Sequence, residues 1–132
     1  MRERFVTCLI AMLALATAVG ITVGFRAFAQ AQSVKQLTLV NLEFEGTKMW
    51  GPGAVVVQKG DTVQLKAINN VKSEPHVHGL AIDAYGIKKE VNVGKPETVE
   101  FTADKAGIFP IYCHLHPAHV GTELVVLESS PR

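Results

Sequence analysis

Metal-binding side-chain types cluster near the carboxyl end of the sequence. The stretch YCHLHPAHV, residues 112–120, contains one cysteine and three histidines, which are Cys113, His114, His116 and His119. Cysteine binds metals as the thiolate and histidine as the neutral imidazole, so this combination favours copper or zinc over magnesium or calcium. The segment is therefore a candidate transition-metal site.

The other two histidines also lie together. His76 and His78 fall within EPHVHG, residues 74–79, so all five histidines of the chain occupy two short segments. Chance rarely produces such a partition. Two loops that meet in the fold would supply ligands from opposite sides of one metal ion.

The amino terminus has the pattern of a targeting segment. Arg2 and Arg4 precede an uncharged apolar run at residues 5–25, and the small-x-small motif AFA follows at residues 27–29. We expect residues 1–29 to be an export signal that is cut after Ala29. The alternative is a retained membrane anchor, because the run approaches the ~20 apolar residues that span a bilayer. Either way, we expect the folded part to be periplasmic or secreted.

The cysteine count then argues against a disulfide. The chain has two cysteines, and Cys8 lies in the amino-terminal segment, so Cys113 is the one thiol of the folded part. An unpaired thiol in an oxidising compartment is a liability unless something occupies it. A buried cysteine that acts as a small hydrophobe is the plainest alternative, but the neighbouring histidines favour a metal ligand.

Composition bounds the fold and the partners. The chain has 132 residues, of which 48% are hydrophobic and 19% charged, as expected for a packed protein with a single domain at residues 30–132. The net charge of +1 gives no indication of nucleic-acid binding. We expect contact with a membrane only if the amino-terminal segment is retained.

The elements that must position the two histidine segments are short strands. Apolar residues alternate, or run through short stretches bounded by turn residues, at 36–44, 54–58, 62–68, 78–83, 97–103, 107–113 and 122–127. This pattern predicts an all-β protein, a Greek-key antiparallel β-sandwich of seven to eight strands. Because a sandwich gathers its loops at two ends, the two histidine segments are expected to meet at one of them.

These residues resemble a known family. GIFPIYCHLHPAHVGTELVVL, residues 107–127, resembles the last third of the cupredoxins plastocyanin and amicyanin. HGLAIDAYGIKKEV and ETVEFTADKAGIFPIYCHLHP are most similar to nitrosocyanin, a red copper protein of the same fold. The resemblance covers roughly residues 53–128. It implies a cupredoxin-like sandwich that holds one mononuclear copper ion per chain.

Transferred one residue at a time, the resemblance implies four copper ligands: His78, Cys113, His116 and His119. His119 stands where the amicyanin-like loop carries its axial methionine, so an imidazole replaces a thioether. His76 competes with His78, because Asn69, Asn70, Pro75 and His76 also resemble the upstream loop of plastocyanin. His76 and Glu74 are further candidates, as groups that orient a ligand imidazole.

Other side chains near the motifs are expected to have structural roles. His114 follows Cys113 directly, so strand alternation should point it away from the metal, at the surface. Trp50, Lys48 and Tyr85 match no chemistry, and packing in the core or at its rim is expected for them.

The resemblance implies a one-electron carrier that serves a redox partner protein. A nitrosocyanin-like red copper centre, with an open position that binds or converts a small molecule such as nitric oxide, is the alternative. Copper delivery, with the extra histidines as a relay, is a third interpretation. Zinc bound by one cysteine and three histidines also satisfies the chemistry.

Overall fold

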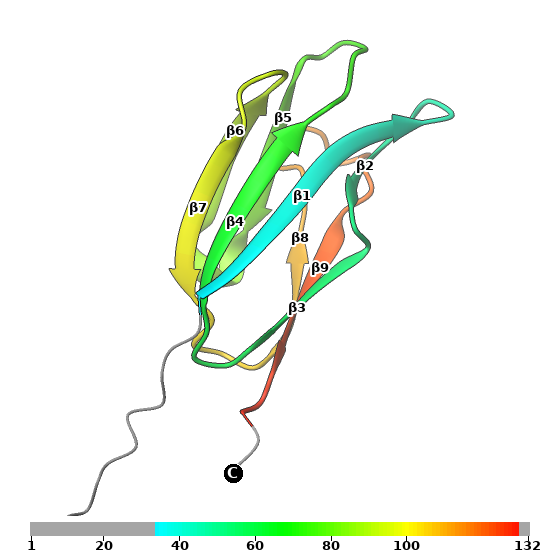
Figure 1. Ribbon diagram of the computed structural model, residues 1–132. Helices are drawn as coiled ribbons and strands as arrows, with labels where there is room; N and C mark the ends of the chain where they lie inside the picture. The colour runs from blue at the N-terminus through cyan, green and yellow to red at the C-terminus, as the bar shows by residue number, and fades with distance from the viewer. Residues whose placement is uncertain (1–33, 130–132) are drawn as a thin grey trace, which may run out of the picture. The chain divides into compact units, whose positions relative to one another are not determined.

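The strands that position the two histidine segments appear in the computed structural model, which describes residues 34–129 (Figure 1). These residues form nine strands and one short 3-10 helix. In chain order they are β1 (Val34–Phe44), β2 (Thr47–Gly51), β3 (Ala54–Gln58), β4 (Thr62–Asn69), β5 (Val77–Ile82), η1 (Asp83–Tyr85), β6 (Ile87–Asn92), β7 (Glu97–Thr102), β8 (Gly107–Ile111) and β9 (Thr122–Leu127). The expected export signal at residues 1–29 lies outside the described residues. No helix within residues 34–129 is long and apolar enough to cross a membrane.

The strands form three hydrogen-bonded sheets. One has four strands in the order β2-β1-β4-β7, one has three in the order β3-β9-β8, and β5 pairs with β6. The predicted cupredoxin-like β-sandwich is confirmed, with two corrections: nine strands occur in the described residues instead of seven to eight, and the pairing is mixed instead of antiparallel. The pairs β1–β4 and β3–β9 are parallel, because long connections return the chain to the same end of a sheet before it pairs again.

Strand β2 lies in a glycine-rich stretch where apolar alternation predicts no strand. Phe44 pairs with Thr47, so only Glu45 and Gly46 form the turn. Both have positive φ, 48° and 77°, which matches the tight hairpin turns whose twist suits antiparallel strands. The hairpin carries Trp50 back along β1.

Strand β6 is likewise not predicted by apolar alternation. Three consecutive charged residues occupy its centre, Lys88, Lys89 and Glu90, and all three are exposed. Only Ile87 and Val91 are buried, so the apolar alternation that identified the other strands is missing. Its pairing with β5, in which His78 lies opposite Val91, fixes the register of the upstream histidine segment.

The inward faces of the sheets form one apolar core. Val, Leu and Ile side chains on alternate positions dominate it, as the period of two requires. Trp50 is the largest of its fully buried side chains and is 2% exposed.

Both histidine segments lie at the same end of the sandwich, which we call the metal pole. Val34 pairs with Thr62 at one end of β1, and Asn41 pairs with Asn69 toward the other. The loop that leads to the upstream segment begins after Asn69, at the end of β4. On the same side, the backbone N–H of Trp50 bonds to the carbonyl of Val120 at 3.0 Å. The described chain begins at the opposite end (Figure 1).

Candidate metal centre

Four side chains from three places in the sequence meet at the metal pole. His78 lies in β5, Cys113 follows β8, and His116 and His119 lie in the loop that leads to β9. One ligand atom from each of the four lies within 4.8 Å of the others. Within the described residues this is the one such group of three or more His, Cys, Asp and Glu side chains.

Backbone hydrogen bonds bring the two segments together. Ala81 and Tyr112 exchange two of them, with N···O distances of 2.9 and 3.1 Å. This bridge holds the residues before Cys113 against β5. The amide of His119 bonds to the carbonyl of His116 at 3.1 Å, which closes a turn and brings both loop imidazoles to the same side.

The three imidazoles and the thiol face one another. The His78 ring centroid lies 4.8 Å from that of His119 and 5.2 Å from that of His116. The rings of His116 and His119 stack at 4.7 Å, and Cys113 Sγ lies 3.5 Å from His116 Nδ1. A thiolate and three imidazoles around one point form a donor set that suits copper or zinc.

The burial of these donors fits a bound metal ion. His78 is fully buried, and neither of its ring nitrogens has a hydrogen-bond partner; Nδ1 of His119 is also buried and unpartnered. A buried polar atom without a partner costs about 1–3 kcal/mol. A metal ion would bind such nitrogens and remove part of that cost, so the residues present match the requirement.

The electrostatics keep these imidazoles ready to bind a metal. Burial, followed by the nearby His119, His116 and Lys48, lowers the pKa of His78 from 6.5 to about 4, although the Pro75 carbonyl opposes the change. Burial, followed by the charges of His116 and Lys48, also lowers the pKa of His119. Both rings are therefore neutral near pH 7, which is the form that donates a lone pair to a metal.

A hydrogen bond reaches the sulfur from the opposite segment. The backbone N–H of Gly79 donates to Cys113 Sγ at 3.1 Å. The carbonyl of Gly79 accepts a hydrogen bond from Nε1 of Trp50 at 3.0 Å. Gly79 therefore links the indole of Trp50 to the candidate thiolate ligand.

His114 does not join the four. It is half-buried instead of lying at the surface as expected, and its Nδ1 is buried without a partner. Its ring occupies the space beside Gly79, because a Cβ at Gly79 would lie only 2.4 Å from His114 Nδ1. Burial, followed by the charge of Lys88, lowers the pKa of His114. The close approach explains why residue 79 has no side chain.

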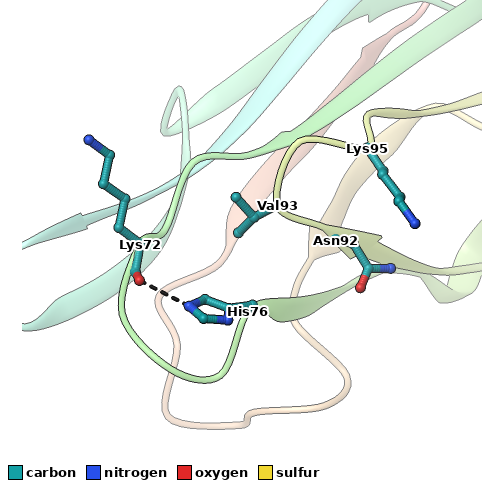
Figure 2. A pocket seen from close by; sticks show the side chains of 5 residues that line it. All are labelled: Lys72, His76, Asn92, Val93 and Lys95. Atoms are coloured by element: carbon teal, nitrogen blue, oxygen red, sulfur yellow. Dashed lines mark hydrogen bonds between the residues drawn. The ribbon is translucent and has the colours of Figure 1, made fainter.

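His76, the competing upstream ligand, lies outside the group of four. Its Nδ1 is 3.1 Å from Glu74 Oε1, and its Nε2 is 3.1 Å from the carbonyl oxygen of Lys72. Figure 2 shows the ring turned toward the backbone carbonyl of Lys72. Asn92, Val93 and Lys95 line the pocket beside it, which has a volume of about 460 Å³. The structure therefore brings His78 to the other donors and leaves His76 and Glu74 paired with each other.

The contacts that Trp50 and Gly79 make beside the four donors are not predicted by the sequence pattern. Packing is expected for Trp50, and its burial confirms it, but its Nε1–H also bonds to Gly79, whose amide donates to Cys113 Sγ. The position of Gly79 directly after His78 was the available signal, because a glycine next to a ligand can mark a close approach of another segment. No local signal pointed to the indole.

Comparison with known proteins identifies relatives of the fold. Residues 8–126 match the family model for the cupredoxin-like domain. The nitrous-oxide reductase of Cupriavidus necator is 42% identical over 57 residues, which are 43% of this chain and 9% of that protein. The nitrous-oxide reductase of Ralstonia nicotianae is 44% identical over 57 residues, with the same coverage. The chain thus spans about a tenth of the length of the curated relatives that it matches.

Solved structures agree on the fold. Copper nitrite reductase from Nitrosomonas europaea superposes with a TM-score of 0.62 and 22% identity, covering 76% of this chain and 45% of that one. At this identity the likeness shows a shared architecture. The match covers most of the sandwich that holds the four candidate ligands.

Proposed function

The chain belongs to the family of cupredoxin-like domains, and on that premise we propose that it binds one copper ion and transfers single electrons. The observation that carries the proposal is the meeting of His78, Cys113, His116 and His119, whose ligand atoms lie within 4.8 Å of one another. Two of these imidazoles hold buried nitrogens without hydrogen-bond partners, which a bound ion would satisfy.

A thiolate with imidazoles accommodates both Cu(I) and Cu(II), so the ion would supply one-electron chemistry. The protein contributes the stiffness of the site. His78 is fixed within β5 by pairing with β6, and Cys113 follows the bridge between Ala81 and Tyr112. Ligands held by strand pairing move little, which favours fast electron transfer.

Exposure of the loop ligands supports contact with a redox partner. His78 and Cys113 are buried, which excludes water from one side of the site, whereas His116 and His119 are half-buried. An electron would therefore enter or leave most directly through the loop imidazoles. The partner would bind at the metal pole.

Whether His119 binds the copper ion distinguishes electron transfer from the binding of a small molecule. An imidazole is a stronger donor than a thioether, so a copper ion held by His119 would favour Cu(II) and have a lower reduction potential than one held by methionine. The half-buried loop imidazoles also favour a second candidate function, in which an open position beside His119 binds or converts a small molecule such as nitric oxide.

We further propose that the protein works outside the cytoplasm, on the basis of the amino-terminal pattern at residues 1–29.

The first experiment tests the thiolate ligand in the copper-loaded full chain. Cys113→Ser should abolish the intense thiolate-to-copper absorption, because Cys113 is the one thiol among residues 34–129. Cys8→Ser is the matched control and should retain the band. If Cys113→Ser retains the band and Cys8→Ser loses it, the assignment of the site is wrong.

A second experiment separates electron transfer from small-molecule binding. His119→Met should raise the reduction potential and shift the spectrum toward that of a blue copper site, because a thioether stabilises Cu(I). Azide should leave the spectrum of the native protein unchanged if all four ligands bind. New bands with azide, together with an unchanged potential in His119→Met, would favour the open site.

A further inference from the structure

Three buried side chains form a row across the sheet at the metal pole. Asn41 of β1 pairs with Trp50 of β2 on one side and with Asn69 of β4 on the other. Paired residues of neighbouring strands project to the same face, and all three are at most 3% exposed. The row therefore points into the sandwich beneath the upstream histidine segment.

The two ends of this row hold the backbone on both sides of His78. Nδ2 of Asn69 donates to the carbonyl of His76 at 3.0 Å, two residues before His78. Nε1 of Trp50 donates to the carbonyl of Gly79 at 3.0 Å, one residue after it. The segment that carries the upstream ligand is thus attached to the four-stranded sheet at two points.

The hydrogen bond from Trp50 to Gly79 affects the residue whose amide donates to Cys113 Sγ. Gly79 lacks a side chain, so it has more backbone freedom than any other residue type. Its strand pairs with β6 on one side, and on the other side the nearest backbone bridge joins Ala81 to Tyr112. The bond from Trp50 removes rotational freedom at the residue whose N–H donates to Cys113 Sγ at 3.1 Å. The direction of that N–H therefore depends on the indole.

We infer that Trp50 is a positioning residue for the metal thiolate: its indole N–H fixes Gly79 so that the Gly79 amide remains directed at Cys113 Sγ. The inference rests on the proposed copper site for its functional meaning. A hydrogen bond to a thiolate draws electron density from the sulfur, which weakens its donation to the metal. The indole thereby favours the reduced state of the site without contacting any ligand.

Loss of the indole donor should change the reduction potential, the absorption band and the exchange rate of the Gly79 amide, each in one direction. With the Gly79 amide less well aligned, the sulfur donates more strongly, so the reduction potential should fall. The thiolate-to-copper absorption should move to longer wavelength, because the sulfur electrons lie higher in energy. In the metal-free protein, the Gly79 amide proton should exchange with solvent about tenfold faster, as expected for the loss of one supporting hydrogen bond.

A single tryptophan makes the test sharp. The chain has one Trp, so biosynthetic replacement of tryptophan by benzothienylalanine changes position 50 alone. This analogue keeps the two-ring shape and replaces the N–H by sulfur. We expect faster Gly79 exchange in the metal-free full chain, and a lower potential with a red-shifted band after copper loading.

Two variants made with standard amino acids complete the experiment. Trp50→Phe also removes the donor and should change the same three readouts in the same direction. Leu65→Val is the control, because it shortens a buried core side chain, 1% exposed, in β4; it should reduce stability but leave the exchange rate, potential and band unchanged. If Trp50→Phe fails to fold, the analogue still decides the question.

The outcomes are distinguishable from a failure of the proposed function. If the protein binds no copper but Gly79 exchange accelerates in the analogue, the link from Trp50 to Gly79 stands and the copper site does not. Unchanged Gly79 exchange in the analogue overturns the inference. So does an unchanged potential and band in a copper-loaded analogue, because a purely structural role for the indole predicts that result.

Discussion

Acid should destabilise the metal-free protein over a defined pH range, because His78 is buried in its neutral form. The pKa of His78 falls from 6.5 to about 4 in the fold, first through burial and then through the neighbouring imidazoles and Lys48. Between these two values the unfolded chain binds a proton that the folded chain excludes. The free energy of unfolding should therefore be unaffected by this group above pH 6.5, decrease toward pH 4, and level off below it.

The size of the loss follows from the same two values. The difference corresponds to at most about 3 kcal/mol at 1.36 kcal/mol per tenfold change in proton affinity. A typical domain is stable by about 5–15 kcal/mol, so the effect should be plain in urea titrations. These would be run from pH 7.5 to pH 3.5 with a chelator and a thiol reductant present.

A matched pair of variants isolates His78 from the other titrating groups. His78→Gln removes the buried imidazole, so the difference curve between native protein and variant should contain the decrease between pH 6.5 and 4. His76→Gln serves as the control, because that side chain is 55% exposed and its removal leaves the buried His78 imidazole in place, so the decrease between pH 6.5 and 4 should persist. A difference curve for His78→Gln that is flat across this range would refute the reasoning, since it would mean that burial does not exclude the proton.

Three further predictions concern single side chains. His78→Ala should weaken copper binding in a competition titration by more than tenfold, whereas His76→Ala should change it little; the reverse order would make His76 the ligand. Asn41→Leu should raise the free energy of unfolding by about 1 kcal/mol, because both polar atoms of the Asn41 side chain are buried without a partner; a marked loss in urea titrations would show that the amide has one. Gly79→Ala should lower the melting temperature and cost about 1–3 kcal/mol, since its Cβ would lie 2.4 Å from Nδ1 and 2.8 Å from the backbone nitrogen of His114. His114→Ala should restore only part of that loss, and full recovery in the double variant would show that the backbone contact does not matter.

Much of the fold could be predicted because strand alternation is a local property. The segment at 54–58 was predicted with the bounds that β3 has, and β4 differs from its predicted range by one residue. Strand β6 could not be recognised in this way, because Lys88, Lys89 and Glu90 face solvent in succession. The parallel pairing of β1 with β4 was also missed, since alternation reports which face a residue occupies and not which strand lies beside it.

The four candidate ligands were predicted from residue types and from the family resemblance, and the structure brings all four together. The choice of His78 over His76 depended on strand register, and β5 does carry His78 inward. The contact from Trp50 to Gly79 could not be foreseen, because the two residues are 29 positions apart and a buried tryptophan usually reflects packing. Such a contact depends on how β2 is placed against β5, which no short motif encodes.

The placement of both described chain ends away from the metal pole determines how the molecule can be immobilised. The seven residue steps from Val34 to Asn41 span about 23 Å along β1 at roughly 3.3 Å per residue. An electrode linker or affinity tag attached just before Val34 would hold the domain by its far end, with His116 and His119 directed away from the support. Such a tether would preserve access for a dissolved partner, but it would place the copper too far from the support for rapid direct exchange. Val120 is 50% exposed beside the loop ligands. A cysteine introduced near it would reverse that orientation and place the metal site close to the electrode surface.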